Sequence, residues 1–317
     1  MGFIGKRLAV TFLTLLLVSV FTFCAFRFIP GDAALLSLGI EAGEEQIEAM
    51  RIEMGLNRSL PGQYFAWLGG FLTGQLGNSA RFRGASVSGI ILERLPVTFS
   101  LAGMSFLLIV AIAFPVSLFS SRKENSITDR IVTTLTALNI SMPGFFLGVL
   151  FIWIFGISLR LFVPGAYVGF TGNPAAFFGY LFFPALAIAL PNAALVVKFL
   201  RSSIFREFHG DYVRTAKSKG GSRALILRRH VLKNASLPAI TLLGMIAGEI
   251  LSGSIVIEQV FGIPGVGRLL IASITARDYP MIETLMIYIA FVVILANTAA
   301  DIVLQIVDPR IRLSEKV

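Results

Sequence analysis

The residues of this chain best suited to binding another molecule are seven lysines and arginines in the stretch DYVRTAKSKGGSRALILRRHVLKNASLP, residues 211–238. Asp211 is the single acidic residue among them. Such a stretch can bind the phosphates of nucleic acid, lie on an acidic membrane surface or form a docking site for another protein. The elements that carry these residues decide among the three.

Motifs for catalysis and nucleotide binding are absent from the sequence. Neither G-x-x-x-x-G-K-[ST] nor H-E-x-x-H occurs, and the glycines of FGIPGVGRLL, residues 261–270, do not have the spacing of a dinucleotide-binding turn. The two histidines, His209 and His230, lie in the basic segment and are expected to form local hydrogen bonds. We therefore expect no catalytic, cofactor or metal site, and a chain that is not an enzyme.

The composition is that of a membrane protein. Of 317 residues, 56% are hydrophobic and 14% are charged, whereas soluble domains hold about 45–50% apolar and 25% charged residues. Six apolar runs are long enough to cross a bilayer core, which takes roughly 20 helical residues. They are Leu8 to Ile29, Val97 to Ser120, Ile131 to Ile157, Leu181 to Leu200, Leu237 to Ile257 and Thr284 to Val307. The first is too long for the apolar core of a cleaved signal peptide and is predicted to stay as a helix.

The distribution of Lys and Arg predicts the orientation, because short cytoplasmic loops collect these residues. With the N-terminus inside, the cytoplasmic segments 1–7, 121–130, 201–236 and 308–317 hold 17 of them in 63 residues, against 8 in the 116 residues of the outer segments. Both termini and the basic segment are therefore predicted to be cytoplasmic. The net charge of +9 then reflects topology, and a nucleic-acid partner is not expected.

Two domains are predicted. Residues 1–96 combine the first transmembrane helix with a small, helical extracytoplasmic cap, in which 41–54 is rich in helix formers and 63–72 supplies aromatic residues beside glycines. Residues 97–317 form a five-helix core with a long cytoplasmic loop at 201–236. In the outer segment 258–283, the Gly and Pro residues predict a bent loop followed by a short surface helix.

Glycines divide the basic segment into two helices. Gly210 and the pair Gly220-Gly221 predict a short helix over 211–219, with Asp211 at its N-terminal end, where the helix dipole favours an acid. A second helix is predicted over 222–235. Ser236 is then expected to cap the fifth span, with Pro238 in its first turn.

Polar residues inside the apolar runs are candidates for a translocation pathway, because ionisable groups are costly within a membrane. Glu249 lies midway along the fifth run and Ser252 follows it. Alternatively, the Glu249 carboxyl is buried against a partner-helix donor or kept protonated. Asn139 and Ser141, with Pro143, are expected to interrupt the third run, and Pro191-Asn192 the fourth.

The run Thr215-Ala216-x-x-x-Gly220, followed by Leu237-Pro238, resembles the loop by which ABC importer permeases dock into a cleft on their ATPase subunit. Arg214 stands where the general pattern has Glu, and Pro238 lies further from Gly220 than usual, as in the dipeptide/oligopeptide/nickel branch. The resemblance implies that docking is performed by Tyr212, Arg214, Thr215, Ala216, Lys217 and Gly220. A salt bridge expected from the general Glu is not transferable.

Seven further segments, in the same order, resemble the first, B-type permease subunit of that branch. They are FRFIPGD (26–32), MGLNRSLPGQY (54–64), ERLPVTFSLA (93–102), RRHVLKNASLP (228–238), FGIPGVGRLL (261–270), RDYP (277–280) and DPRIR (308–312). The resemblance implies a type I importer permease fold with six spans, in a bacterial or archaeal inner or plasma membrane. It also implies a homologous second permease, two cytoplasmic ATPases that bind ATP and Mg²⁺, an extracytoplasmic binding protein and surrounding lipid.

The function expected from this resemblance is ATP-driven import of peptides or related small solutes. Import of nickel or a metal chelate by the same family is an alternative. A transporter that works without ATP is an alternative of another class, although the paired interrupted helices of such proteins are not evident. The sequence leaves the cargo open.

Overall fold

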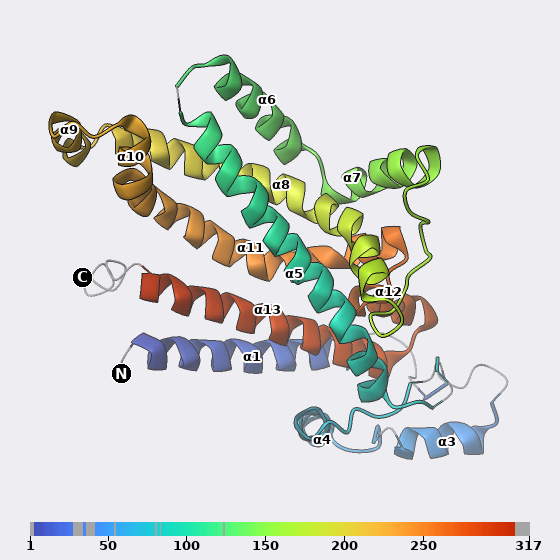
Figure 1. Ribbon diagram of the computed structural model, residues 1–317. Coiled ribbons are helices and arrows are strands. Elements are labelled where there is room, and N and C mark those ends of the chain that lie inside the picture. The colour runs from blue at the N-terminus through green and yellow to red at the C-terminus, as the bar shows by residue number, and fades with distance from the viewer. Residues whose placement is uncertain are drawn as a thin grey trace. The chain divides into compact units, whose positions relative to one another are not determined.

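The computed structural model describes residues 3–27, 34–35, 42–53, 55–79, 81–82, 84–122 and 124–307, and most of these are helical (Figure 1). Within these ranges the only extended pairing is a single bridge between Asn78 and Ser86. The all-α fold class is therefore confirmed. The end of the first predicted run, at Ile29, and the DPRIR tail lie outside the described residues.

Six helical segments are long and apolar enough to cross a membrane, if a bent pair counts as one of them. Five are the single helices α1 (Phe3–Arg27), α5 (Val87–Ser120), α8 (Pro174–Phe208), α11 (Leu232–Phe261) and α13 (Tyr279–Val307). The sixth is a pair in which α6 (Ile127–Ser141) is followed by α7 (Gly144–Phe151) and its π-helical continuation η1 (Ile152–Ser158). Each of the six predicted runs coincides with one of these segments.

The third span is broken, as its polar residues and proline predicted. α6 and α7 are bent by 99° relative to each other. The break lies at Met142 and Pro143, which both have extended backbone. Proline disfavours the helical conformation in the residue before it, so the chain leaves the helix at Met142.

Helix boundaries differ from the sequence-based expectations at three prolines. α5 begins at Val87 and passes through Pro96, because Val87 and Ile91 are buried in a hydrophobic cluster that holds the turns before the proline. α8 is continuous through Pro191, so the predicted interruption of the fourth span does not occur. α11 passes through Pro238, and the Ser236 hydroxyl donates to the Lys233 carbonyl within the helix instead of capping it. Packing by neighbouring helices allows a membrane helix to tolerate such prolines.

The helices form two compact units, and the first consists of Met1–Thr98 and Pro264–Leu295. It contains the helices predicted within the cap, α3 (Glu44–Glu53) and α4 (Leu60–Thr73), and the short helix predicted after the outer loop, α12 (Val266–Ala276). A buried cluster from α5, α12 and α13 forms its core: Val87, Ile91, Val266, Leu269, Leu270, Met281, Ile282 and Leu285. Asp278, fully buried, accepts a hydrogen bond from the Ser79 hydroxyl and so holds the 75–86 loop against the start of α13.

The second unit consists of Phe99–Ile263 and Ala296–Val317. Its centre is the long contact between α8 and α11, against which α6 and α7 also pack. The α7 contact is close, because a Cβ at Gly148 would lie 3.0 Å from the Phe261 ring. At the same end, the Tyr180 hydroxyl donates to the Phe261 carbonyl at 2.5 Å and accepts from the Gly165 amide at 2.9 Å.

Candidate functional site

The basic segment contains a short helix, α9 (Asp211–Ser218), which agrees with the helix predicted over 211–219. Gly210 precedes it in an extended conformation, Asp211 lies in the first turn and Lys217 in the last. These charges suit the two ends of the helix dipole. Figure 1 shows α9 at the end of the second unit where α8 ends and α10 (Arg223–Ile226) begins.

Two glycines end α9, and each has a different physical reason. Gly220 has φ +81°, a left-handed conformation that glycine adopts without steric cost. Its amide donates to the Lys217 carbonyl and the Gly221 amide donates to the Ala216 carbonyl, which together make a Schellman motif. A Cβ at Gly221 would lie 2.9 Å from the Ala216 carbonyl oxygen. The predicted glycine hinge is therefore a tightly structured helix end.

One side of α9 is buried and the other is open. Val213 is fully buried and Ala216 is half-buried on the side that packs on α10. Thr215, Lys217 and Arg214 are exposed, and the Arg214 side chain is 80% accessible with a 3.7 Å ion pair to Asp211. The exposed side chains are thus available to a second protein, whereas Val213 and Ala216 hold the helix in place.

Tyr212 links α9 back to α8. Its hydroxyl donates to the Glu207 carboxylate at 2.7 Å. Partial burial, with this hydrogen bond, raises the pKa of the Tyr212 phenol above its usual range. A Cβ at Gly210 would lie 2.9 Å from the Tyr212 ring, so the absent side chain makes room for it.

α9 is joined to two long helical segments by short connections. His209 and Gly210 separate it from α8, and Lys219 to Ser222 separate it from α10. α10, the π-helix η2 (Leu227–Val231) and α11 then form one helical segment from Arg223 to Phe261. Leu227, Val231 and Ala235 of this segment are buried, whereas Ala224 is exposed. A displacement of α9 would therefore act on two packed helices.

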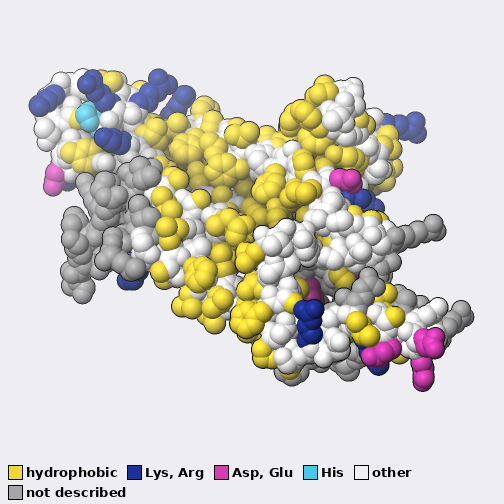
Figure 2. Space-filling model, turned by 90° about the horizontal axis from the view of Figure 1, so that it is seen from below, with side chains coloured by type: hydrophobic (Ala, Val, Ile, Leu, Met, Phe, Trp, Pro, Cys, Tyr) yellow, Lys and Arg dark blue, Asp and Glu magenta, His cyan; other side chains and the backbone are white. Residues whose placement is uncertain are grey.

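Lys and Arg side chains gather around a histidine at the end of the molecule where α9 and α10 lie (Figure 2). Arg228, Arg229 and Lys233 are exposed there, and the Arg223 guanidinium lies over the Phe208 ring at 4.8 Å from its centroid. His209 makes the local hydrogen bond expected of it, between Nδ1 and the Phe205 carbonyl at 2.9 Å. The charge is thus concentrated beside α9.

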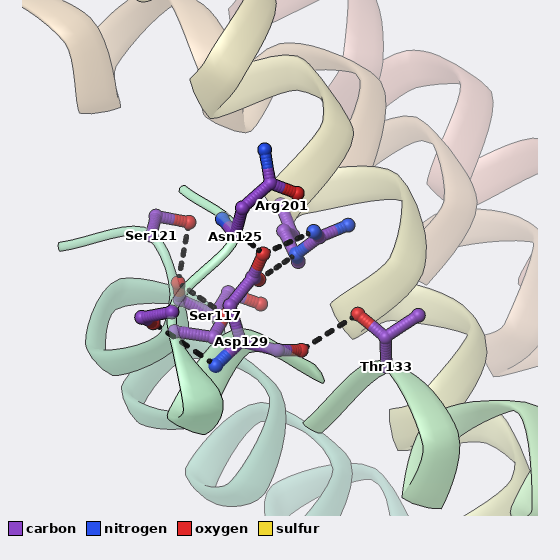
Figure 3. A network of polar contacts seen from close by, with 8 residues as sticks. Ser117, Ser121, Asn125, Asp129, Thr133 and Arg201 are labelled. Atoms are coloured by element: carbon purple, nitrogen blue, oxygen red, sulfur yellow. Dashed lines mark hydrogen bonds and ion pairs between the residues drawn. The ribbon is translucent and has the colours of Figure 1, made fainter. Parts of the chain in front are cut away.

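A buried ion pair joins α6 to α8 near the end of α8 that leads to α9. The Arg201 Nε and Nη2 donate to the two Asp129 carboxylate oxygens at 2.5 and 2.8 Å. Figure 3 shows the Asp129 carboxylate between Arg201 and the turn before α6, where the Asn125 amide donates to it at 3.0 Å. The Ser126 hydroxyl caps α6 by accepting from the Asp129 amide at 3.2 Å. The pair thus fixes the start of α6 against α8.

Two of the predicted pathway residues lie on one face of α11. Glu249 and Ser252 are exposed, and so are Met245 and Val256, one turn before and one turn after them. The Ser252 hydroxyl donates to the Glu249 backbone carbonyl at 3.0 Å. Within the described part of the chain, no hydrogen bond or ion pair is made by the Glu249 carboxylate. A carboxylate at mid-helix therefore faces outward from this chain.

Asn139 and Ser141 lie in the last turn of α6, just before the bend. The Asn139 side-chain amide donates to the Leu135 carbonyl and the Ser141 hydroxyl to the Ala137 carbonyl, at 2.9 and 3.0 Å. Ser141 is exposed and Asn139 is half-buried. Their hydrogen bonds are to their own helix and not to Glu249 or Ser252, so their role in a pathway stays a prediction.

Sequence reasoning missed Asp129, Arg201 and Tyr180. The signal for the ion pair was present, because an acid follows a Ser-capped helix start and an arginine lies near the inner end of the next apolar run. Their separation of 72 positions along the chain hides the pairing.

The chain matches known proteins over nearly all of its length. The family described as binding-protein-dependent transport system inner membrane component matches residues 113–313, and the N-terminal region of the membrane component of such systems matches residues 1–102. A protein of Brucella abortus named as a peptide transport system permease protein is 35% identical over 307 residues, which are 97% of this chain and 98% of the relative.

Two other relatives are similar to the chain over their whole length. A protein of Sinorhizobium fredii named as a peptide ABC transporter permease protein is 33% identical, over 98% of this chain and 99% of the relative. The dipeptide transport system permease protein DppB of Lactococcus lactis is 32% identical, over 98% of this chain and 99% of the relative. The resemblance found in the sequence is confirmed, and this multi-pass membrane protein belongs to the family of inner membrane components of binding-protein-dependent transport systems.

Proposed function

We propose that this chain is the permease subunit of an ATP-driven importer of short peptides, in which α9 receives mechanical work from a separate ATPase. The geometry of α9 is the observation that carries the proposal. The helix presents exposed Arg214, Thr215 and Lys217, while Val213 is fully buried and α9 contacts α10. It is also connected closely to two packed helices, α8 and α11.

The energy comes from outside the chain. The sequence has no phosphate-binding loop, so two partner ATPases bind ATP and Mg²⁺. When the ATPases close on ATP, they push α9. Because α9 is connected to α8 and to the segment α10–η2–α11, these packed helices move with it. Docking of a homologous second permease and an extracytoplasmic binding protein completes the assembly. The positive-inside distribution of Lys and Arg supports cytoplasmic termini and a cytoplasmic α9.

The names of the relatives described above support a peptide as cargo. They are named for peptide or dipeptide transport, and none of the three for nickel. Glu249 supports a polar passage, because a carboxylate with no partner among the described residues is costly in a membrane unless water, cargo or another subunit meets it. Glu249 is on the exposed face of α11. In the assembled transporter it therefore faces the second permease or the passage between the two permeases.

A charge placed on α9 tests the proposal. Ala216→Glu, and Thr215→Glu on the exposed side, are expected to abolish the ATP hydrolysis that a loaded binding protein stimulates in the reconstituted complex. Ala224→Glu is the matched control, because Ala224 is exposed on α10, after the Gly220-Gly221 turn that ends α9. Full stimulation in both α9 variants would refute docking at α9. Peptide uptake by liposomes that hold the chain without ATPases would refute the ATP-driven function itself.

A further inference from the structure

The helix α4 (Leu60–Thr73) has no charged residue, in contrast to its neighbour in the chain. Its sequence is LPGQYFAWLGGFLT, and the whole stretch 59–80 lacks Lys, Arg, Asp and Glu. α3 (Glu44–Glu53), a few residues earlier, carries four glutamates and an arginine in ten residues. Both helices lie in the connection between α1 and α5. α3 has the composition of a water-facing helix, whereas α4 does not.

α4 is fastened to the membrane-spanning helix α1 by its inner face. The Tyr64 and Ser19 hydroxyls are hydrogen-bonded at 2.8 Å. The Phe23 ring packs against Tyr64 and Trp67, with ring centroids 5.4 and 5.8 Å apart. Both contacts come from inside the apolar segment Gly5–Ala25, which is long enough to span a membrane.

These contacts set the depth of α4. Ser19 and Phe23 lie within the last two turns of the described part of this apolar segment, so α4 lies near the end of the spanning helix. Helices that lie in a membrane interface bury their apolar face about 5–10 Å into the headgroup and acyl boundary. In Figure 1, α4 is seen nearly end-on while α1 is seen from the side, so the α4 axis crosses α1. A helix that crosses a spanning helix at this depth lies along the membrane.

The outer face of α4 is apolar and exposed. Phe65 is 68% and Leu72 is 77% accessible, and with Pro61 and Gly69 they recur at helical spacing on one side. Leu17 and Phe21 of α1 are exposed beside the contact positions Ser19 and Phe23. The exposed face of α4 therefore continues the lipid-facing surface of the spanning helix.

We propose that α4 is an interfacial membrane anchor whose outer face, formed by Pro61, Phe65, Gly69 and Leu72, contacts phospholipid acyl chains. Tyr64 and Trp67 suit this position, because amphipathic aromatic rings collect at the membrane boundary. Arg58 and Arg81 flank the uncharged stretch, so the chain returns to charged sequence on both sides of the anchor. The anchor sets the level at which the connection between α1 and α5 leaves the membrane.

A tryptophan reporter tests the proposal in the full-length chain. The chain has two tryptophans, so Trp67→Phe with Trp153→Phe removes the background, and Phe65→Trp adds one reporter on the outer face. In phosphatidylcholine bilayers with brominated acyl chains, this reporter is expected to lose much of its fluorescence and to resist aqueous iodide. Ile52→Trp on the same background is the matched control, because Ile52 of α3 is similarly exposed, at 58%.

The outcomes separate lipid from its alternatives. The Ile52→Trp reporter is expected to be quenched by iodide and not by the brominated lipid. Iodide quenching of the Phe65→Trp reporter equal to that control would overturn the proposal in favour of water. If brominated lipid quenches the reporter in the isolated chain but not in the assembly with its co-purifying subunits, a protein partner covers the face and the proposal is wrong. The measurement does not involve transport, so it is independent of the proposed function.

Discussion

The Arg201 guanidinium and the Asp129 carboxylate form a two-point ion pair that is largely hidden from solvent, with side-chain accessibilities of 24% and 3%. Arg201 also lies over the Phe205 ring, 4.9 Å from its centroid. It is seven residues from the end of α8, where the chain enters α9. The pair therefore attaches α6 to the part of α8 that would receive a movement of α9.

Breaking this pair is expected to destabilise the second unit. Asp129→Asn or Arg201→Met leaves the other group partly buried without its partner, which costs about 3 kcal/mol, or less where Arg201 reaches solvent. The loss is measured as a lower Tm of the purified chain. In the double variant the two losses should be less than additive. Glu48→Gln, which breaks the exposed pair with Arg51 on α3, should shift Tm little, and an equal shift would contradict the structural role of Asp129.

Gly220 is expected to tolerate only residues that accept a left-handed backbone. Its φ of +81° costs an ordinary L-residue about 1–2 kcal/mol, and a β-branched side chain more. Gly220→Val should therefore disorder the end of α9 and uncouple ATP hydrolysis from binding protein, while Gly220→Asn should retain most of the coupling. Equal activity of the two variants in a stimulated ATPase assay would show that the helix end is unimportant.

Glu249 is expected to be needed for transport but not for insertion. Removing its charge with Glu249→Gln or its side chain with Glu249→Ala should lower peptide uptake by about tenfold or more, since the costly carboxylate has no partner among the residues that the structure describes. Ser252→Ala, on the same face, should have a smaller effect because its hydroxyl already bonds within the helix. Full uptake in both Glu249 variants would remove the residue from the pathway.

The Asn297 side chain of α13 lies against Gly248 of α11, and a Cβ at Gly248 would overlap its amide oxygen. Because Asn297 is exposed and its side chain can turn away, Gly248→Ala is expected to destabilise the chain by about 1 kcal/mol or less. Asn297→Ala in addition should restore much of the lost Tm, because it removes the atom that clashes. Gly253→Ala is the matched control on the same helix, since a Cβ at Gly253 meets nothing within 4 Å. If Asn297→Ala does not restore Tm, the loss of stability comes from a contact other than the one with Asn297.

Local properties were readable from the sequence. The six apolar runs, the short helix between Gly210 and Gly220 and the break at Pro143 all depend on hydrophobicity, helix ends or backbone restriction within a few residues. The family was readable for a related reason, because its motifs are short and occur in a fixed order along the chain.

Only the tertiary structure decided which polar side chains pair with each other and whether a helix continues through a proline. Pro96, Pro191 and Pro238 lie inside helices whose nearby residues, Val97, Ala193 and Ala239, are buried, and a local rule cannot anticipate that compensation. Asp129 meets Arg201, and Ser79 meets Asp278, across 72 and 199 positions of the chain. Sequence shows which groups are costly to bury, but only the folded chain brings together the partners that satisfy them.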